Sequence, residues 1–392
     1  MASTTYPISL VSRPNYASNL IFNGTIVNSG AATTYCKLPA IKYYAYATSD
    51  INLQIGSKTF SLFSGNLTEI NLSASDGTQN FATFANTANT TWSAKTLPAS
   101  IDSYSIKYGG ESFLIARGNN SNYYISTNGI SWTQKTWPSS NYGTMATYGV
   151  GSWLVHDGAN PSHSYSSTDL ITWITATTPF NGSVYSARYL NEKYFATYAG
   201  NLGFSTDGIA WTTVTLPYSG LWMDVAYGKN TYVATTFNSN IAASSTDGIS
   251  WTQRTMPASG LWYTTVYGNG MFVSVNANSG SGTGAISTDG ITWTSKQFAN
   301  GTYFYSVEYG NGIFMAVGAG VVSTTIAASS TDGITWTART IPSGNWYRVA
   351  YGNGSFVAHQ VSGTTTNNIA VASATPATTT QFLLYKRSGE TY

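Results

Sequence analysis

Residues that could carry out acid–base chemistry are few in this sequence. Its 392 residues include 15 acidic side chains, and charged residues make up only 8% of the chain. Hydrolysis of a glycosidic bond needs two carboxylates about 5–10 Å apart. Asp224 and Glu308 are the best candidates, because both fall on predicted strands that would face the centre of the fold. Five other aspartates belong to a repeated turn, so we favour structural roles and predict no catalytic residue and no enzymatic activity.

No metal or cofactor site is predicted. His156, His163 and His359 lack the spacing of metal ligands, and the single Cys36 excludes an intramolecular disulfide. The chain has no phosphate-binding or dinucleotide-binding motif. Its net charge is only +2 and its basic residues are scattered, so we expect no nucleic-acid partner. We also expect no membrane insertion and no signal peptide, because the sequence has neither a long apolar run nor the corresponding N-terminal pattern.

Aromatic side chains are the most informative candidates for binding. Four of them stand five residues before a repeated Tyr-Gly pair, namely Trp222, Trp262, Phe304 and Trp346. Aromatic faces stack on sugar rings, and large aromatics also fill the space between packed sheets. Both interpretations stay open: blade-to-blade packing, or a rim that contacts a glycan or a protein. In the second case further tyrosines would extend the rim, namely Tyr142, Tyr263, Tyr303 and Tyr347.

These residues belong to a repeat of about 40 residues. A segment of the form S-T-D-G-I-x-W recurs six times, with Asn128 for Asp in the first copy and Leu170 for Gly in the second, and neighbouring copies of its tryptophan are 38–43 residues apart. A second segment, Y-G-x-G-x-F-V, alternates with it, and its tyrosine recurs seven times. Each unit reads as four short strands separated by Gly/Asn turns, which is the pattern of one propeller blade. The sequence therefore predicts an all-β fold with a seven-bladed β-propeller.

The tryptophan segments resemble the Asp-box repeats of sialidase-like propellers, although the spacing here is one residue shorter. The resemblance covers roughly residues 90–375. It implies that each aspartate accepts backbone hydrogen bonds within its turn and that each tryptophan packs between sheets. The expected turn residues are Asp169, Asp207, Asp247, Asp289 and Asp332.

The same resemblance raises a glycosidase as an alternative function. A sialidase site would need three clustered arginines, a tyrosine nucleophile with a glutamate partner, and an aspartic acid. Arg117, Arg188 and Arg348 lie on no shared motif, and the Phe/Tyr-Arg-Ile-Pro segment of that family is absent. We therefore rank this alternative, and that of a free soluble lectin, below a binding role.

The ends of the repeat predict how the ring closes. Trp92 heads a last-strand segment without a preceding Tyr-Gly element, whereas Tyr351 has no tryptophan segment after it. Pairing the C-terminal strands of residues 351–373 with the strand near Trp92 would complete one mixed blade and leave no open edge. The alternative is that Thr380–Arg387 supplies its own fourth strand, with Phe382 replacing the tryptophan.

Residues 1–85 do not follow the repeat, but alternate as short strands. They predict a small N-terminal β-sandwich, with the propeller at 86–392. In composition the N-terminal segment is similar to attachment domains of bacteriophage tail and virion proteins. We therefore expect a non-enzymatic virion display protein, anchored to other virion or tail proteins by this domain, whose propeller binds a host surface glycan or protein or a neighbouring subunit. A homo-oligomer and a secreted location stay open.

Overall fold

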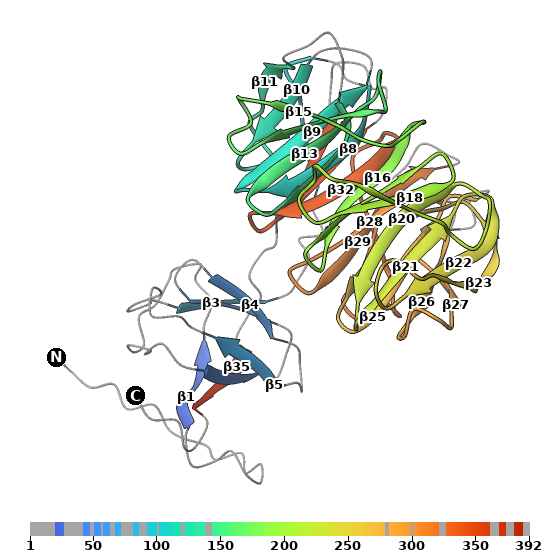
Figure 1. Ribbon diagram of the computed structural model, residues 1–392. Helices are drawn as coiled ribbons and strands as arrows, with labels where there is room; N and C mark the ends of the chain where they lie inside the picture. The colour runs from blue at the N-terminus through green and yellow to red at the C-terminus, as the bar shows by residue number, and fades with distance from the viewer. Residues whose placement is uncertain are drawn as a thin grey trace. The chain divides into compact units, whose positions relative to one another are not determined.

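A computed structural model describes residues 20–26, 42–47, 51–55, 58–62, 67–71, 81–85, 92–99, 102–118, 122–137, 143–278, 282–298, 302–320, 327–360, 368–373 and 380–386. The regular structure of these residues is entirely β (Figure 1). None of them forms a helix long and apolar enough to cross a membrane. The chain divides into two units, Met1–Ala88 with Ala374–Tyr392, and Asn89–Ser373.

The second unit is a propeller of seven four-stranded blades, as the repeat predicts. The innermost strands are β8 (Asp102–Gly109), β12 (Gly143–Gly149), β16 (Val184–Leu190), β20 (Trp222–Gly228), β24 (Trp262–Gly268), β28 (Thr302–Gly310) and β32 (Trp346–Gly352). The second strands are β9 (Ser112–Gly118), β13 (Ser152–Asp157), β17 (Lys193–Tyr198), β21 (Thr231–Thr236), β25 (Met271–Asn276), β29 (Ile313–Gly320) and β33 (Ser355–Gln360).

Two further strands complete each blade. The third strands are β10 (Asn122–Ser126), β14 (His163–Ser167), β18 (Asn201–Ser205), β22 (Ser239–Ser245), β26 (Thr283–Ser287), β30 (Ala327–Ser330) and β34 (Ile369–Ser373). The outermost strands are β11 (Thr133–Thr136), β15 (Ile174–Thr177), β19 (Thr212–Val214), β23 (Thr252–Gly260), β27 (Thr294–Gln297), β31 (Thr337–Arg339) and β7 (Ser93–Lys95). Each innermost strand contacts those of the two neighbouring blades, and β32 contacts β8, so the inner strands enclose a central axis.

The Tyr-Gly pairs explain how neighbouring blades fit together. Gly268 ends β24 directly against the ring of Tyr309 in the next blade, and a Cβ atom at Gly268 would lie 2.2 Å from Tyr309 Cγ. Only glycine leaves that space free, because real Cβ atoms do not approach so closely. The last such contact joins Gly352 to Tyr108 of the first blade, at 2.0 Å from Cβ to Cγ, and so runs across the closure of the ring.

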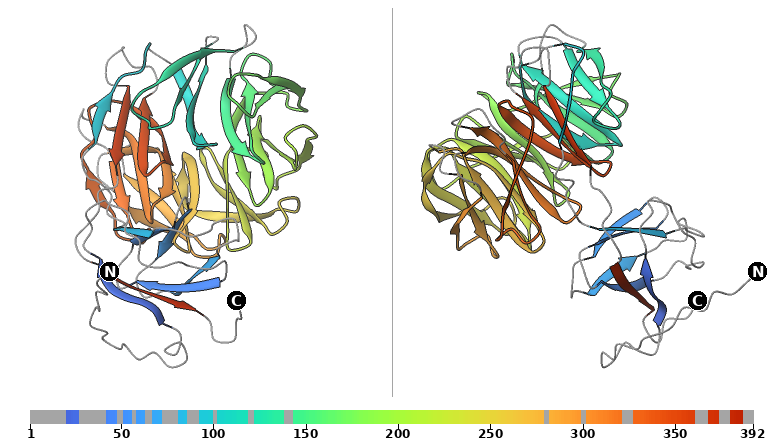
Figure 2. Two further views of the ribbon diagram at one scale, coloured as in Figure 1. Left: turned by 90° about the vertical axis from the view of Figure 1, so that its left-hand side faces the viewer. Right: turned by 180° about the vertical axis from the view of Figure 1, so that it is seen from behind.

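The ring closes through the mixed blade that the sequence predicts. Strand β7 pairs antiparallel with β34, with Ser93 opposite Val371 and Lys95 opposite Ile369. Strand β7 and the last blade lie side by side in Figure 2, where cyan meets red. Trp92 is buried beside this strand, with 7% of its surface exposed.

The repeated aspartates hold the turn between the third and fourth strands. One carboxylate oxygen of Asp207 accepts the backbone N–H groups of Ile209 and Ala210, both at 2.8 Å. The indole nitrogen of Trp211 donates to the carbonyl oxygen of Gly208 at 3.1 Å, which fixes the ring beside the turn. The same pair of carboxylate bonds recurs at Asp169, Asp247, Asp289 and Asp332.

The first unit consists of two sheets. One has the strand order β1 (Leu20–Ile26), β35 (Thr380–Lys386), β2 (Lys42–Ala47) and β5 (Leu67–Asn71). The other has the order β4 (Lys58–Leu62), β3 (Ile51–Ile55) and β6 (Phe81–Ala85).

Strand β35 corrects two expectations. It does not supply a propeller strand, because it pairs with β1 and β2 instead. Residues 374–392 therefore group with the first unit, whereas we expected the propeller to extend over 86–392. The chain thus leaves the first unit, forms the whole propeller, and returns to complete the sheet where it began. Cys36 lies outside the described residues.

Candidate functional site

The four aromatics expected on a rim are buried inside the propeller. Each has 1% or less of its surface exposed: Trp222, Trp262, Phe304 and Trp346. The three indole nitrogens donate to backbone carbonyl oxygens at 2.7–3.1 Å. The prediction of an exposed aromatic rim is therefore wrong for these four residues, and blade-to-blade packing, the interpretation left open beside it, is what the structure has.

A β-bulge near the start of each innermost strand explains this placement. In β24 the pairing with β25 passes from Trp262 to Thr264 and leaves Tyr263 as the extra residue. The same irregularity occurs in all seven innermost strands. A bulge changes the direction of neighbouring side chains. The aromatic before the bulge packs into the blade, and the bulged residue itself is directed to the axis.

Bulged residues line a pocket at the mouth of the central channel, with a volume of about 400 Å³. The tyrosines come from four of the seven blades, on β8, β16, β24 and β32, and are Tyr104, Tyr185, Tyr263 and Tyr347. Apolar side chains fill the spaces between them, namely Met145, Leu221, Met223 and Phe237. Pockets of this size with aromatic walls and a few polar groups are typical of small-molecule and sugar sites.

Sequence reasoning found half of this tyrosine set. Tyr263 and Tyr347 were predicted, and their ring centroids are 6.0 Å apart at an angle of 79°. Tyr104 and Tyr185 were missed, although both stand four residues before the repeated tyrosine of their blade, Tyr108 or Tyr189, which is the signal that could have found them. Tyr303 is half-buried but does not line this pocket. Tyr142 lies outside the described residues.

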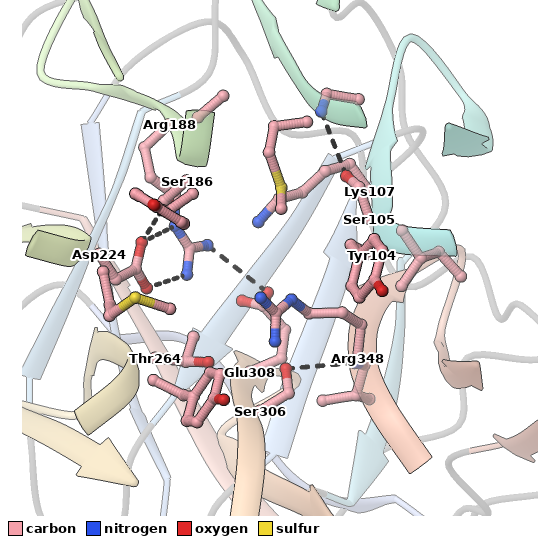
Figure 3. Close-up of a pocket in the computed structure, with 18 of the residues that line it drawn as sticks. Tyr104, Ser105, Lys107, Ser186, Arg188, Asp224, Thr264, Ser306, Glu308 and Arg348 are labelled. Atoms are coloured by element: carbon pink, nitrogen blue, oxygen red, sulfur yellow. Dashed lines mark hydrogen bonds and ion pairs between the residues drawn. The ribbon is translucent and has the colours of Figure 1, made fainter. Parts of the chain in front are cut away.

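Five charged side chains gather below the mouth, where the channel narrows to a volume of about 30 Å³. They come from five innermost strands, β8, β16, β20, β28 and β32, and are Lys107, Arg188, Asp224, Glu308 and Arg348. Figure 3 shows their side chains converging on the middle of the channel. They occupy two positions of the repeat, one and three residues before the repeated tyrosine of each blade, where most blades carry small or uncharged residues.

Arg188 and Asp224 form the central ion pair. The Arg188 guanidinium binds both carboxylate oxygens of Asp224, at 3.0 and 2.7 Å, and also lies 4.0 Å from Glu308 Oε2. Asp224 further accepts hydrogen bonds from the Ser186 hydroxyl and the Thr265 backbone N–H. Burial would raise the pKa of the Asp224 carboxyl, but the Arg188 charge outweighs it and lowers that pKa. For Arg188, burial opposes the charge, and the Asp224 carboxylate more than offsets this effect and raises the pKa.

Arg348 and Lys107 are bound less completely. The Arg348 guanidinium donates to the carbonyl oxygens of Tyr347 and Tyr305, at 3.2 and 3.4 Å, and lies over the Tyr347 ring at 4.4 Å from its centroid. Among the described residues, the Lys107 amine has no hydrogen-bond or ion-pair partner. Burial, together with the Arg188 charge, lowers the pKa of Lys107 to about 8.

This arrangement suits binding better than acid–base catalysis. Both candidate carboxylates lie against Arg188, and Asp224 is committed to four hydrogen bonds, so it is not placed to deliver a proton. None of the three histidines lines the pocket; His156 and His359 are fully buried elsewhere. Among the described residues no group of three or more His, Cys, Asp or Glu side chains could hold a metal ion.

Comparison with known proteins identifies the fold. No protein-family model matches the chain, and no curated protein sequence matches it. Selenomethionine-substituted virginiamycin B lyase from Staphylococcus aureus aligns with a TM-score of 0.61 and 13% identity, over 72% of this chain and 99% of the lyase.

Two further structures have similar values. YCF48 bound to D1 peptide aligns with a TM-score of 0.55 and 14% identity, over 72% of this chain and 95% of YCF48. The Cps50 (Swd1) β-propeller domain of Myceliophteria thermophila aligns with a TM-score of 0.54 and 11% identity, over 73% of this chain and 100% of that domain. At such identities the similarity shows the propeller fold and nothing about activity.

Proposed function

We propose that this chain is a non-enzymatic display protein of a bacteriophage virion, whose propeller binds a surface glycan in the axial pocket. The observation that carries this proposal is the pocket of about 400 Å³ with tyrosines from four of the seven blades in its wall. Tyrosine rings offer apolar faces for the C–H face of a sugar and hydroxyl groups for its hydroxyls. The pocket, and not the buried tryptophans, is therefore the proposed contact surface.

The absence of enzymatic activity is part of the proposal. The lyase that shares the fold is an enzyme, and a histidine-to-alanine variant of it is described as catalytically inactive. None of the three histidines of the present chain reaches the axial pocket, and its two central carboxylates are held by one arginine. These features favour binding over turnover.

The virion role rests on the first unit. A small β-sandwich built from both ends of the chain would anchor the protein to other virion or tail proteins, and the propeller would provide the ligand site. The low fraction of charged residues, 8%, together with the richness in Tyr, Asn, Ser and Thr, fits a display surface. Co-sedimentation of the protein with purified virions tests this part, and recovery only in the unbound fraction contradicts it.

The pocket is tested by two substitutions with a matched control. We expect Tyr263→Ala and Tyr347→Ala each to weaken binding on a glycan array, since loss of one aromatic contact costs about 0.5–1.5 kcal/mol beyond the lost area. Tyr303→Ala is the control, because this tyrosine lies on β28 but outside the pocket. Equal binding by all three variants and the unchanged protein would remove the pocket as the glycan site. Turnover of chromogenic glycosides would contradict the non-enzymatic part.

A further inference from the structure

The charges at the base of the axial pocket do not balance. Three cations, Lys107, Arg188 and Arg348, face two carboxylates, Asp224 and Glu308, which leaves one positive charge over. Both carboxylates interact with Arg188, Asp224 in a bidentate pair and Glu308 at 4.0 Å. The excess positive charge is therefore carried by Lys107 and Arg348.

These two cations are placed to act together. Lys107 lies on β8 and Arg348 on β32, and these strands are neighbours in the ring. Arg348 borders both the wide mouth and the narrow base, whereas Lys107 borders only the base. The neutral partners of Arg348, two carbonyl oxygens and the Tyr347 ring, leave its charge without a counter-ion. A partly desolvated cation without a counter-ion is unfavourable, and an arriving anion relieves that cost.

We infer that Lys107 and Arg348 form a carboxylate-binding subsite, so that the glycan recognised by the pocket is an acidic one that carries a carboxylate-bearing sugar. This inference rests on the proposed glycan-binding function and names the class of its ligand. The surplus of one charge matches a carboxylate monoanion better than a phosphate dianion. The base of about 30 Å³ exceeds the roughly 10–15 Å³ that one water molecule needs and can take a small anionic group, and the mouth of about 400 Å³ has room for the sugar ring.

Protonation of the lysine gives the subsite a second signature. With a pKa of about 8, Lys107 is charged at pH 7 and loses its charge as the pH rises toward 9. The groups that act on it are Arg188 and Arg348, which lower this pKa, and Asp224 and Glu308, which raise it. Binding of an acid should therefore weaken over this pH range, whereas binding of a neutral sugar should not.

The experiment compares acids with their neutral esters. A glycan array carries oligosaccharides that end in glucuronic, galacturonic or N-acetylneuraminic acid, together with their methyl esters. Binding of the full chain to this array is measured at pH 7 and pH 9. We expect at least one acid to bind about tenfold to a hundredfold more tightly than its ester, the range given by loss of a charged hydrogen bond. Lys107→Met and Arg348→Met should each abolish most of this preference. Lys107→Met should also leave binding of the ester unchanged, because Lys107 borders only the base of the pocket.

Three further variants keep the result interpretable. Lys107→Arg retains the charge and should restore the preference for acids. Arg254→Met removes one positive charge on outer strand β23, where its side chain donates to Ser244 Oγ, and should have no effect. Thermal melts identify variants that do not fold, and the pH comparison on the unchanged protein needs no variant at all.

The outcomes separate the two proposals. Equal binding of every acid and its ester overturns the carboxylate subsite and leaves the glycan pocket standing. A preference for acids that survives both Lys107→Met and Arg348→Met overturns the assignment to these two residues. If no glycan binds, acidic or neutral, the proposed function itself has failed.

Discussion

At the scale of single residues, the turn aspartates show how one oxygen atom organises a chain reversal. We expect Asp289→Ala to destabilise the propeller by about 1 kcal/mol, because the N–H groups of Ile291 and Thr292 lose a bond but regain water at an exposed turn. Asp289→Asn is the matched control. The first copy of the turn naturally carries Asn128, whose side-chain oxygen accepts the same two bonds at 2.8 and 2.9 Å. In thermal unfolding, the native protein and the Asn variant should have similar melting temperatures, and the Ala variant a lower one. Equal melting temperatures for all three proteins would contradict the role of Asp289 in the turn.

Two buried histidines should make the stability of the fold sensitive to acid. His156 and His359 are fully buried, and neither ring nitrogen has a hydrogen-bond partner among the described residues. Burial lowers the pKa of each to about 3, whereas an unfolded histidine titrates near 6.5. The unfolded chain thus takes up protons first, so stability is full above pH 6.5 and falls as the pH drops toward 3. Between pH 6.5 and 5 the loss is about 2 kcal/mol for each histidine.

Other blades show which residue can replace these histidines. Two other blades carry Val275 and Val317 at the equivalent position of the second strand. The double variant His156→Val, His359→Val should flatten the free energy of unfolding between pH 6.5 and 5, measured by denaturant titration. The turn aspartates do not interfere, because their lowered pKa values, such as about 2 for Asp169, place their loss of stability below pH 4. An unchanged pH profile would exclude the histidines as its cause.

At the scale of elements, the glycine of the Tyr-Gly pair determines how closely two blades approach. We expect Gly268→Ala to cost about 3 kcal/mol, because its Cβ would overlap the Tyr309 ring and force the blades apart. Gly270, two residues away in the same hairpin, has open space around it but a φ of +75°. Gly270→Ala should therefore cost only about 1–2 kcal/mol of backbone strain. Equal losses in unfolding free energy would mean that the close approach of Gly268 is not what limits the packing.

The elements also show which features could be predicted from the sequence and which could not. Four strands in each 40-residue unit, seven blades and the closing strand at Trp92 followed from the repeat, because each is encoded by local spacing. The direction of the Trp262 side chain could not be predicted in this way. Alternation of side chains along a strand assumes regular pairing, and the bulge at Tyr263 interrupts that pairing. The placement of Asp224 and Glu308 at the centre of the fold was predicted, but their grouping with cations was not. Lys107 and Arg348 lie far apart in sequence and share no motif, and only closure of the ring makes their strands neighbours.

At the scale of the whole molecule, segments from both halves of the sequence pair to complete the last propeller blade and to complete a sheet of the first unit. Strand β7 completes the last blade, and β35 lies between β1 and β2 in the first unit. These two strands therefore have separate roles, although each pairs segments from opposite ends of the sequence. Removing one of them should damage only the unit that it completes.

Two deletions test this division. Deletion of 92–97 removes β7 and leaves β34 as an open edge, so we expect the propeller to lose cooperative unfolding even though no complete repeat is missing. Truncation after Ser373 removes β35, and should leave the propeller transition in place because all seven blades keep their strands. Calorimetry separates the two units, and near-ultraviolet circular dichroism follows the buried tryptophans of the blades. A native tryptophan spectrum after deletion of 92–97 would contradict closure through β7. Loss of that spectrum after truncation at Ser373 would show that the propeller depends on the first unit for its own stability.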